Sequence, residues 1–493
     1  MQTEKQRASD KDGAPVSLAG EWNSIDWRTA KREVKRLQMR IAKAVEEGRW
    51  GRAKALQHIL THSFYAKALA VRRVTSNKGR KTPGVDGVVC KTAREKMEAV
   101  HRIRQRGYTA LPLRRVRIPK KNSPKKRPLS IPCMDDRAVQ AVHKMGLDPI
   151  AETLADHHSY GFRRFRSCAD ANAQLFSLLA KRYSPRWILE ADIEGCFDRI
   201  SHSWLLRFIP MKRHILRQWL RAGYVENGHL LTTEEGTPQG GIASPVLANM
   251  TLDGLEAAIR KAVGTKRIEG QWPKVHLVRF ADYFVVTAAR RSQLEEQVLP
   301  AVETFLRERG LNLSKMKTRI VHIREGFDFL GQALRKFGDK LIIRPAKTAI
   351  QSLLRTVKME LRRLLSAPVK EVVGKLNPIL RGWANYHRHV VASSTFRYID
   401  WRVRQALWRW ARRRHQNHSR HWISRRYWRV LPNANRFTAA WREKSGKRYT
   451  LCLFRLADLP IRRHVRIRCA ANPYSPSWQE YFAQRIAMKP MRI

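Results

Sequence analysis

The chain has no paired cysteines of the kind that metal sites and disulfide frameworks use. Its six cysteines are Cys90, Cys133, Cys168, Cys196, Cys452 and Cys469, and no two of them form a Cys-x-x-Cys pair. This scatter argues against a zinc site and against a disulfide framework. We therefore expect the thiols to be buried or incidental.

Long apolar runs are also missing. No segment offers about 18 continuous apolar residues, the length that a transmembrane helix requires. The first residues, MQTEKQRASDKDG, lack the apolar core of a secretory signal. The sequence therefore predicts a cytoplasmic protein with no membrane partner.

Acidic residues are scarce relative to basic ones. The 493 residues include 98 Lys and Arg against 41 Asp and Glu, which gives a formal net charge of +57. A compact chain with this surplus repels itself unless a polyanion neutralises it, so RNA or DNA is the expected partner. The length allows two to four domains.

What the sequence does contain is a pair of aspartates at strand ends. The stretch 274–288 reads KVHLVRFADYFVVTA, and its alternation around Ala281-Asp282 predicts a β-hairpin with a carboxylate at the tip. A second strand, WILEAD, ends about ninety residues upstream at Asp192. Two carboxylates on adjacent strand ends can hold two Mg²⁺ ions about 3.5–4 Å apart, which suits in-line phosphoryl transfer.

Eight motifs in one order carry a resemblance to a known family. They are TPGVDG (82–87), IPKKNSPKKRPLSIP (118–132), SYGFR (159–163), LEADIEGCFDRISH (189–202), GTPQGGIASPVLAN (236–249), RFADYFVV (279–286), GFDFLG (326–331) and LNPILRGWANYHRH (376–389). With this set the chain resembles the reverse transcriptase–maturase proteins of bacterial group II introns, from about Trp27 to about Phe482. Many members continue into a zinc-containing endonuclease domain, which we do not expect in a chain ending at Ile493.

The resemblance implies an α+β fold, a right-hand polymerase whose fingers and palm surround an antiparallel sheet. We expect a disordered tail at 1–20, a helical N-terminal extension at 21–90, and fingers and palm at 91–345. A helical thumb and maturase domain at 346–470 and a C-terminal tail at 471–493 would complete the chain. The implied function is RNA-templated DNA synthesis together with binding of the intron RNA and help in its splicing and mobility, in the bacterial cytoplasm.

The same resemblance implies the site residues and the ligands. Mg²⁺, with Mn²⁺ as an alternative, would be held by the catalytic carboxylates Asp192 and Asp282. The deoxynucleotide triphosphate, opposite an RNA template and at the end of a DNA primer, would meet Lys120, Arg127, Phe197, Gln239, Gly240, Gly241 and Lys317. An aromatic ring at position 197 would collide with a ribose 2′-hydroxyl. Intron RNA would meet Arg381, Trp383, Tyr386, Arg412, Arg413 and Arg414.

Several of these residues also have plainer interpretations. Phe197 can pack in the core, Lys317 can be an exposed surface lysine, and the basic run 114–127 can be a solvated face. The segment 401–430 holds ten Arg, five Trp and no acidic residue. Interleaved Arg and Trp suit folded or single-stranded RNA, although we expect about half of these Trp to face a core.

The surrounding elements follow from periodicity and turn residues. Apolar spacing predicts at least two helices within 27–71, interrupted near 47–50, and a long helix over 350–365. Further helices are expected at 202–209 with Ser201 as its cap, at 243–255 and at 303–317. Strands with turns at Gly331 and Gly338 are expected over 326–343.

One residue departs from the family pattern. The family's box resembles Tyr-Ala-Asp-Asp, whereas this chain reads Phe280-Ala281-Asp282-Tyr283. A phenol is neutral at physiological pH and gives no negative charge to a metal pair, so a site that needs three carboxylates retains two. Three functions therefore stay open: a reverse transcriptase with maturase activity, an RNA-binding splicing maturase without polymerase activity, and a retron-like or host-adopted reverse transcriptase.

Overall fold

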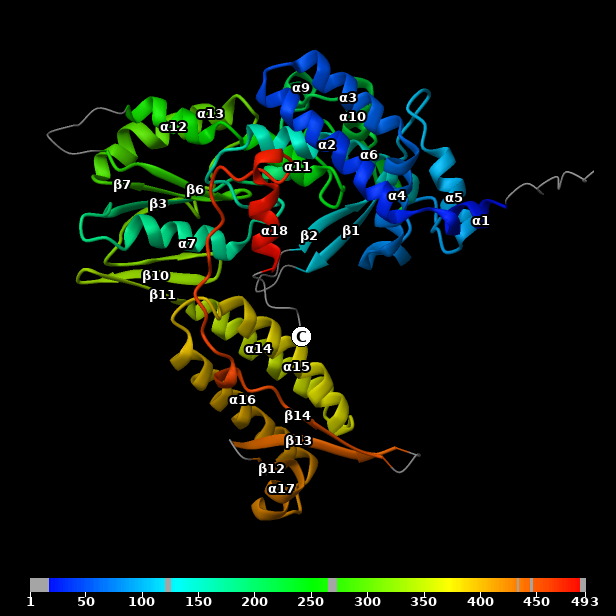
Figure 1. The fold of residues 1–493 in the computed structure, drawn as a ribbon. Coiled ribbons are helices and arrows are strands. Elements are labelled where there is room, and N and C mark those ends of the chain that lie inside the picture. The colour runs from blue at the N-terminus through cyan, green and yellow to red at the C-terminus, as the bar shows by residue number, and fades with distance from the viewer. Residues whose placement is uncertain (1–16, 120–125, 265–272, 432–433, 444–446, 488–493) are drawn as a thin grey trace, which may run out of the picture.

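Figure 1 shows a broad body with an arm that projects from one side. The computed structural model describes residues 17–119, 126–264, 273–431, 434–443 and 447–487. Within these residues it contains mixed helices and antiparallel sheets, and no helix there is long and apolar enough to cross a membrane. The α+β fold class is therefore confirmed.

The N-terminal part is a helical bundle. Its helices are α1 (Leu18–Ser24), α2 (Trp27–Glu46), α3 (Trp50–His62), α4 (Phe64–Ser76), the short η1 (Lys78–Lys81), α5 (Ala93–Arg102) and α6 (Met134–Leu154). The predicted interruption near 47–50 is confirmed, because Gly48 has a φ of +70° between α2 and α3. Because α1 begins at Leu18, residues 18–20 belong to a helix rather than to the disordered tail expected at 1–20.

A small sheet lies beside this bundle. Its order is β2-β1-β4-β5, from β2 (Lys126–Ile131), β1 (Leu113–Pro119), β4 (Tyr224–Glu226) and β5 (His229–Leu231). The basic run therefore forms an antiparallel hairpin in which Ile118 faces Arg127. Lys120, which belongs to that run, lies outside the described residues.

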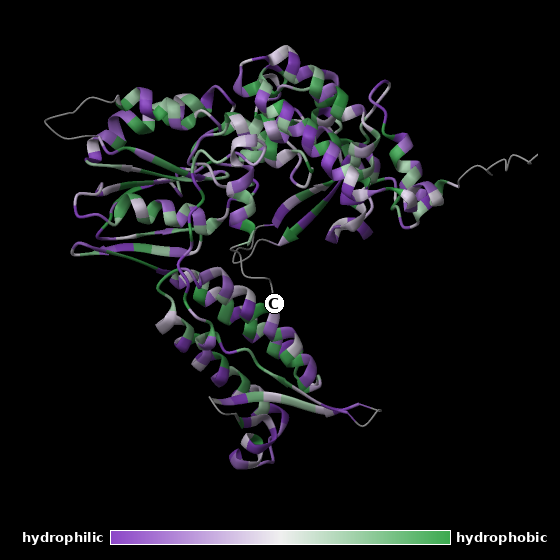
Figure 2. Ribbon diagram, viewed as in Figure 1, coloured by the Kyte–Doolittle hydropathy of each residue, from purple (hydrophilic) through white to green (hydrophobic). Residues whose placement is uncertain are grey.

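The central sheet has the order β6-β7-β3-β8. Its strands are β6 (His276–Phe280), β7 (Tyr283–Ala288), β3 (Trp187–Asp192) and β8 (Arg319–His322). Alternate residues of β3 reach two different cores, since Leu189 belongs to one apolar cluster and Ile188 to the other. Figure 2 shows these strands as largely hydrophobic, as expected for a sheet covered on both faces.

Helices cover both faces of this sheet. They are α7 (Cys168–Leu179) on one face and α11 (Ser244–Leu252), α12 (Leu255–Val263), the π-helical η2 (Gln293–Val298) and α13 (Leu299–Arg307) on the other. Between β3 and β4 the chain forms α8 (Cys196–Arg199), α9 (His202–Phe208) and α10 (Arg213–Arg221). Ser201 caps α9 as predicted, because its hydroxyl accepts a hydrogen bond from the Trp204 amide. The helix expected at 303–317 is instead α13, which ends at Arg307 where Gly310, with a φ of +74°, turns the chain.

A second small sheet leads into the arm. It contains β9 (Phe327–Phe329), β10 (Gln332–Phe337) and β11 (Lys340–Pro345), and both predicted turns are confirmed by positive φ at Gly331 and Gly338. The arm then consists of α14 (Lys347–Arg363), α15 (Val369–His387), α16 (Ser393–Arg414) and α17 (Arg420–Tyr427).

The arm is not purely helical, which corrects the expectation for 346–470. A three-stranded antiparallel sheet follows α17, from β12 (Trp428–Leu431), β13 (Ala434–Arg442) and β14 (Arg448–Cys452). Phe437, Thr438 and Ala439 are buried, whereas Ala440 and Arg442 are exposed. Residues 437–442 (FTAAWR) thus show no period-two burial pattern that the sequence could have revealed.

The C-terminal segment is packed rather than a free tail. After η3 (Leu456–Asp458) the chain runs back from the arm to the body and ends in η4 (Pro476–Trp478) and α18 (Gln479–Ala487). Figure 1 shows this return in red, with α18 beside the cyan and green elements of the body. We call residues 460–487 the return segment. Phe482, from α18, lies 4.8 Å from Phe165 between ring centroids.

Candidate active site and nucleic-acid surface

The predicted hairpin is present, with Asp282 at its tip. Phe280 pairs with Tyr283, so Ala281 and Asp282 form a two-residue turn between β6 and β7. Ala281 has a φ of +58°, whereas Asp282 does not have a positive φ, which is the pattern of a type II′ turn. Because this conformation normally favours glycine, the surrounding structure must hold the turn in place.

A buried network under the hairpin supplies that support. Arg279 is fully buried and donates to Asp253 at 2.5 Å and to Asn249 at 3.4 Å. Burial raises the pKa of Asp253 to about 7, while the Arg279 charge opposes this. Gly161 packs so closely that a Cβ there would lie 2.2 Å from the Ala281 nitrogen. The SYGFR motif thus fastens the turn through close backbone contact.

Asp192 lies directly beside this tip. It is the last residue of β3 and faces Tyr283 across the ladder, while the next amide, of Ile193, donates to the Asp282 carbonyl at 3.2 Å. The Lys317 ammonium lies 2.5 Å from Asp192 Oδ2. Asp192 is largely shielded, with 17% of its side chain exposed, whereas 66% of Lys317 is exposed. Two predicted strand-end carboxylates and the predicted lysine therefore come together.

The electrostatics of Asp282 reflect this crowding. Burial raises the pKa of its carboxyl, and the neighbouring charge of Asp192 raises it further. A hydrogen bond from its own backbone amide and the charges of Lys317 and Arg127 act in the opposite direction. Two close carboxylates favour binding of positive charge between them, while the nearby cations partly offset their negative charge.

The donor set fits a divalent metal ion held by two carboxylates. Mg²⁺ commonly takes one or two carboxylates, keeps several waters and adds substrate phosphates. No group of three or more His, Cys, Asp or Glu side chains suitable for a metal occurs within the described part of the chain. Asp192 and Asp282 therefore offer a two-carboxylate site, in which the exposed Lys317 contacts the carboxylate that a metal would take.

Tyr283 has a structural role, because its hydroxyl and its ring both contact other residues of the protein. Its hydroxyl donates to Glu190 at 3.1 Å and to the Asp328 carbonyl at 2.8 Å, and its ring stacks on Phe329 with centroids 5.2 Å apart. Burial raises the pKa of this phenol, so it stays neutral. Glu190 is nearly buried and paired with Arg319 at 2.9 Å, so it does not replace the missing carboxylate.

Of the remaining predicted nucleotide contacts, Arg127 and Phe197 lie on β2 and α8. Arg127 is exposed on β2, and its charge lowers the pKa of Asp282. Phe197 is half-buried on α8, packed against the first core, with its ring centroid 6.1 Å from that of Phe162. The plainer interpretation of Phe197 as a core residue thus holds for one part of its ring surface.

The glycine-rich turn at 239–241 packs against neighbouring elements of the chain. The Gln239 carbonyl accepts from the Ser130 amide at 2.7 Å, and its side chain donates to Asp198 at 2.7 Å. A Cβ on Gly240 would lie 2.6 Å from the Ser130 carbonyl oxygen, and one on Gly241 would lie 2.6 Å from the Ser244 hydroxyl. Contact with β2 and α11 therefore suffices to require both glycines.

Comparison with known proteins places this geometry in a family. Residues 118–334 match the family described as reverse transcriptase (RNA-dependent DNA polymerase), and residues 22–103 match the N-terminal domain of reverse transcriptase. Residues 350–428 match the group II intron, maturase-specific domain. Protein YkfC of Escherichia coli is 32% identical over 320 residues, which cover 56% of this chain and 83% of that protein. The chain belongs to the group II intron reverse transcriptase–maturase family.

Other relatives are more distant. The group II intron-encoded protein LtrA of Lactococcus lactis is 29% identical over 352 residues, which cover 59% of this chain and 58% of that protein. The chain thus spans little more than half the length of that relative. A telomerase structure from Candida albicans aligns with a TM-score of 0.35 and 13% identity over 64% of this chain and 63% of that one. Reverse transcriptase domains use divalent metal ions, and these domains bind nucleic acid.

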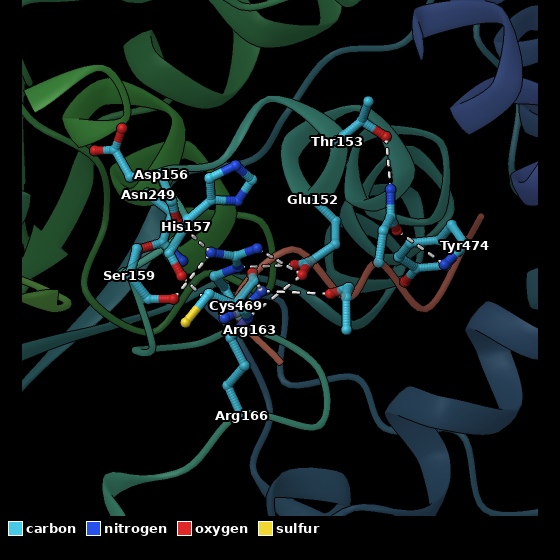
Figure 3. Close-up of polar contacts among 12 residues, drawn as sticks. Glu152, Thr153, Asp156, His157, Ser159, Arg163, Arg166, Asn249, Cys469 and Tyr474 are labelled. Carbon is cyan, nitrogen blue, oxygen red and sulfur yellow. Dashed lines mark hydrogen bonds and ion pairs between the residues drawn. The ribbon is translucent and has the colours of Figure 1, made fainter. Parts of the chain in front are cut away.

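In this reverse transcriptase–maturase, Arg163 and Arg166 are buried supports. Arg163 donates to Glu152 at 2.6 Å and to the carbonyls of Asp156 and Ser159. Arg166 donates to the Cys469 carbonyl at 2.8 Å and so holds the return segment (Figure 3). Sequence reasoning missed this role, because both arginines reach their partners only through tertiary folding.

The predicted RNA residues of α15 lie where the arm meets the body. Tyr386 donates to the Leu330 carbonyl at 2.7 Å, between β9 and β10. Trp383 packs on His387 with centroids 4.2 Å apart, and Arg381 is exposed. Tyr386 also lines a cavity of about 910 Å³ with Phe280 of the hairpin. The other walls of that cavity carry Arg388, Arg462, Arg463, Arg466, Arg468 and Arg485.

The predicted arginines of α16 lie at the other end of the arm. Arg412 and Arg413 are exposed, whereas Arg414 is half-buried and donates to the Ala367 carbonyl between α14 and α15. Of the five Trp between 401 and 430, Trp410 and Trp428 are buried and Trp401 is 54% exposed. Figure 2 shows the neighbouring α17 as largely hydrophilic. The two predicted RNA surfaces are thus separated by the length of the arm.

Proposed function

We propose that this chain is a reverse transcriptase that copies an RNA template into DNA and also binds group II intron RNA to assist its splicing and mobility. The carrying observation is the pair Asp192 and Asp282, joined by adjacent strands and a backbone hydrogen bond, with Lys317 beside them. The family match at 118–334 supports this assignment of chemistry.

Asp192 and Asp282 would hold Mg²⁺, with Mn²⁺ as an alternative. When bound, such an ion supplies a Lewis acid that lowers the pKa of a primer hydroxyl and offsets charge on a pyrophosphate leaving group. The chain's own task is positioning, since phosphoryl transfer needs few protein groups beyond correct geometry and charge. The buried Arg279–Asp253 pair serves that task by holding the turn under Asp282.

The basic side chains would receive the triphosphate. Arg127 suits phosphate through its fork of donors, and we assign the same role to Lys120. Lys317 neutralises Asp192 before ligands arrive, and its exposure leaves it free to turn toward phosphate. Phe197 would screen the sugar with its exposed ring surface, while Gln239, Gly240 and Gly241 would line the nascent base pair.

The arm would bind RNA through Arg381, Trp383 and Tyr386 near the body and through Arg412, Arg413 and Arg414 at the far end. The basic cavity that joins Phe280 to Tyr386 supports a continuous nucleic-acid path from the active site to the arm. We further propose a helical extension up to about residue 90, fingers and palm to about 345, and an RNA-binding domain beyond it. A location in the bacterial cytoplasm belongs to the same proposal.

A second candidate is a splicing maturase without polymerase activity. The observation that favours it is Tyr283, which leaves two carboxylates where the family pattern has three. A retron-like role is weaker, because residues 350–428 match the maturase-specific domain of group II introns.

Primer extension tests the choice between the two candidates. An RNA template annealed to a DNA primer should be copied in the presence of Mg²⁺ and deoxynucleotides, and Asp192→Asn or Asp282→Asn should abolish synthesis while RNA binding persists. Failure of the native chain to extend any primer, with RNA binding intact, would favour the splicing maturase.

A further inference from the structure

A second concave site lies on the far side of the body from the arm. It has a volume of about 780 Å³ and is bounded by α3, α6, α9 and the turn that leads into α10. Figure 1 shows α3, α9 and α10 together at the top of the molecule, opposite α14, α15 and α16. The volume falls within the roughly 300–1,000 Å³ typical of ligand pockets. Neither Asp192 nor Asp282 lines it, so we call it the α3–α9 pocket.

Aromatic rings stand open at this pocket. Trp50 is 39% exposed and Phe208 is 53% exposed, although both are large apolar side chains. Trp204 lies against Phe208 with centroids 4.9 Å apart, and the guanidinium of Arg309 lies 5.1 Å from the Trp204 ring centre. Exposed flat rings beside a hollow are typical of a stacking surface.

Two buried polar groups in the pocket lining have no hydrogen-bond partner. Gln57 is 8% exposed and His143 is 3% exposed, and the Nε2 atom of each is unpaired. Burial lowers the pKa of His143 to about 3, so its ring is neutral and one ring nitrogen can accept a hydrogen bond. Gly146 makes room for Gln57, since a Cβ there would lie 2.9 Å from Gln57 Cγ. Unpaired buried donors and acceptors are costly, which indicates a ligand that pairs with them.

The rim of the pocket is cationic. Lys54, Arg207, Lys212 and Arg213 are all exposed, and none of them forms an ion pair with another described residue. The one carboxylate among the described lining residues is Asp253, which is already bonded to Arg279. A ligand with negative charge around a flat polar centre complements these walls.

We propose that the α3–α9 pocket binds an unstacked base of single-stranded RNA. The base would stack on Trp50 and Phe208, its polar edge would meet Gln57 and His143, and the flanking phosphates would lie on the cationic rim. Bases of single-stranded RNA are recognised by stacking on aromatic rings together with hydrogen bonds to their edges. A base within a duplex is stacked on both faces and its edge is paired with another base. Duplex RNA therefore does not fit the α3–α9 pocket. The inference rests on the proposed function in taking RNA as the partner.

Photocrosslinking at defined sites tests it, because total RNA binding by a chain of charge +57 would hide the loss of one pocket. The probe is an oligouridylate of about 12 nucleotides that contains one 4-thiouridine, a length within the site sizes of single-strand binders. The probe is irradiated in the presence of the full chain, and the crosslinked peptides are identified by mass spectrometry. We expect crosslinked peptides from 50–62 or 204–213. The yield there should fall about tenfold in Trp50→Ala and in Phe208→Ala, which corresponds to about 1.4 kcal/mol for the loss of one stacking ring.

Controls separate this pocket from the rest of the RNA surface. Phe337→Ala removes a ring of similar exposure, 44%, from β10, and should leave the pocket crosslinks unchanged. The same oligonucleotide annealed to its complement should give no crosslinks in the pocket. Crosslinks confined to the arm would overturn this inference while leaving RNA binding intact, whereas no crosslinks anywhere would contradict the proposed function itself.

Discussion

At position 282 a carboxylate stands where its surroundings oppose its charge. Burial and the neighbouring Asp192 both raise the pKa of Asp282 above its ordinary value. A carboxyl whose pKa is higher in the folded state binds protons more readily there than in the unfolded chain. Its ionisation therefore lowers the free energy of unfolding as the pH rises through that higher pKa. A cation that binds this carboxylate in the folded state only would offset the destabilisation.

Thermal unfolding of Asp282→Asn measures this balance. Without divalent metal at neutral pH, we expect the variant to melt at the same temperature as the native chain or higher, because the disfavoured charge is gone. Mg²⁺ should stabilise the native chain by about 2.7 kcal/mol at 100-fold excess over its Kd, and the variant much less. Asp339→Asn, at an exposed carboxylate, is the control. Equal stabilisation of both variants by Mg²⁺ would remove Asp282 from the metal site.

Tyr283 offers the second test at this scale. Tyr283→Asp places a carboxylate on the strand position that faces Asp192, so we expect faster DNA synthesis than in the native chain. The phenol's two hydrogen bonds and its stack on Phe329 are lost, so the free energy of unfolding should fall by about 1–3 kcal/mol. This cost exceeds what strand preference alone predicts.

Tyr283→Asn is the matched control, because it loses the same contacts without adding charge. Synthesis should rise in the Asp variant only. If the native chain already polymerises as fast as the Asp variant, a third carboxylate is not needed. If the Asp variant is inert, the site has lost function elsewhere.

At the scale of elements, sequence pattern predicted the strands, turns and caps that depend on neighbouring residues in the chain. The hairpin at 274–288, the strand that ends at Asp192 and the Ser201 cap follow from alternation and from turn residues, and the structure has them. The sheet of β12, β13 and β14 was missed because its apolar face depends on contact with the arm's helices. The supports under the active site could not be foreseen either, since Arg279 and Asp253 meet only through tertiary folding.

The return segment was likewise missed, because the groups that hold it, among them the buried carboxylate of Asp170, lie far away in the chain. Asp170, on α7, accepts from the Ile467 amide at 2.8 Å, His464 at 2.8 Å and Arg485 at 2.9 Å. Burial would raise the pKa of Asp170, but His464 and other donors hold it below its ordinary value. This contribution to stability is present above the unfolded pKa and is lost as the pH falls through the folded one.

Asp170→Asn should therefore release the return segment. Removing one partner of a buried ion pair costs about 3–5 kcal/mol, and here that cost acts on a local element. Limited proteolysis with trypsin should cleave rapidly at Arg462, Arg463, Arg466 or Arg468 in the variant. Asp458→Asn, which removes a more exposed ion pair with Arg436, should leave the cleavage rate nearly unchanged. Unaltered protection in Asp170→Asn would show that the other contacts of the segment hold it without this carboxylate.

At the scale of the whole molecule, net charge indicates the class of partner, and the fold determines which cationic side chains are exposed. The net charge of +57 predicted a polyanionic ligand, but only the structure separates exposed cations from structural ones. Arg412 and Arg413 are exposed, whereas Arg414 is tied to the Ala367 carbonyl. Composition cannot make that distinction, because each of the three residues is an arginine on one helix.

RNA binding should respond to salt accordingly. We expect affinity for single-stranded RNA to fall steeply between about 50 and 200 mM salt. Arg412→Ala with Arg413→Ala should lower the slope of log affinity against log salt by roughly 0.7 per arginine that contacts phosphate, without changing the melting temperature. Arg414→Ala should lower the melting temperature. An unchanged slope in the double variant would remove this end of the arm from the RNA interface.

The most direct test of the central claim is template-directed incorporation of a single nucleotide. A DNA primer is annealed to four RNA templates that differ only in the base to be copied, and Mg²⁺ is supplied with one nucleotide at a time. We predict that each template directs addition of its complementary deoxynucleotide, in preference to the ribonucleotide, and that Asp192→Asn abolishes addition on all four. Addition that ignores the template, or that survives in Asp192→Asn, would contradict the account.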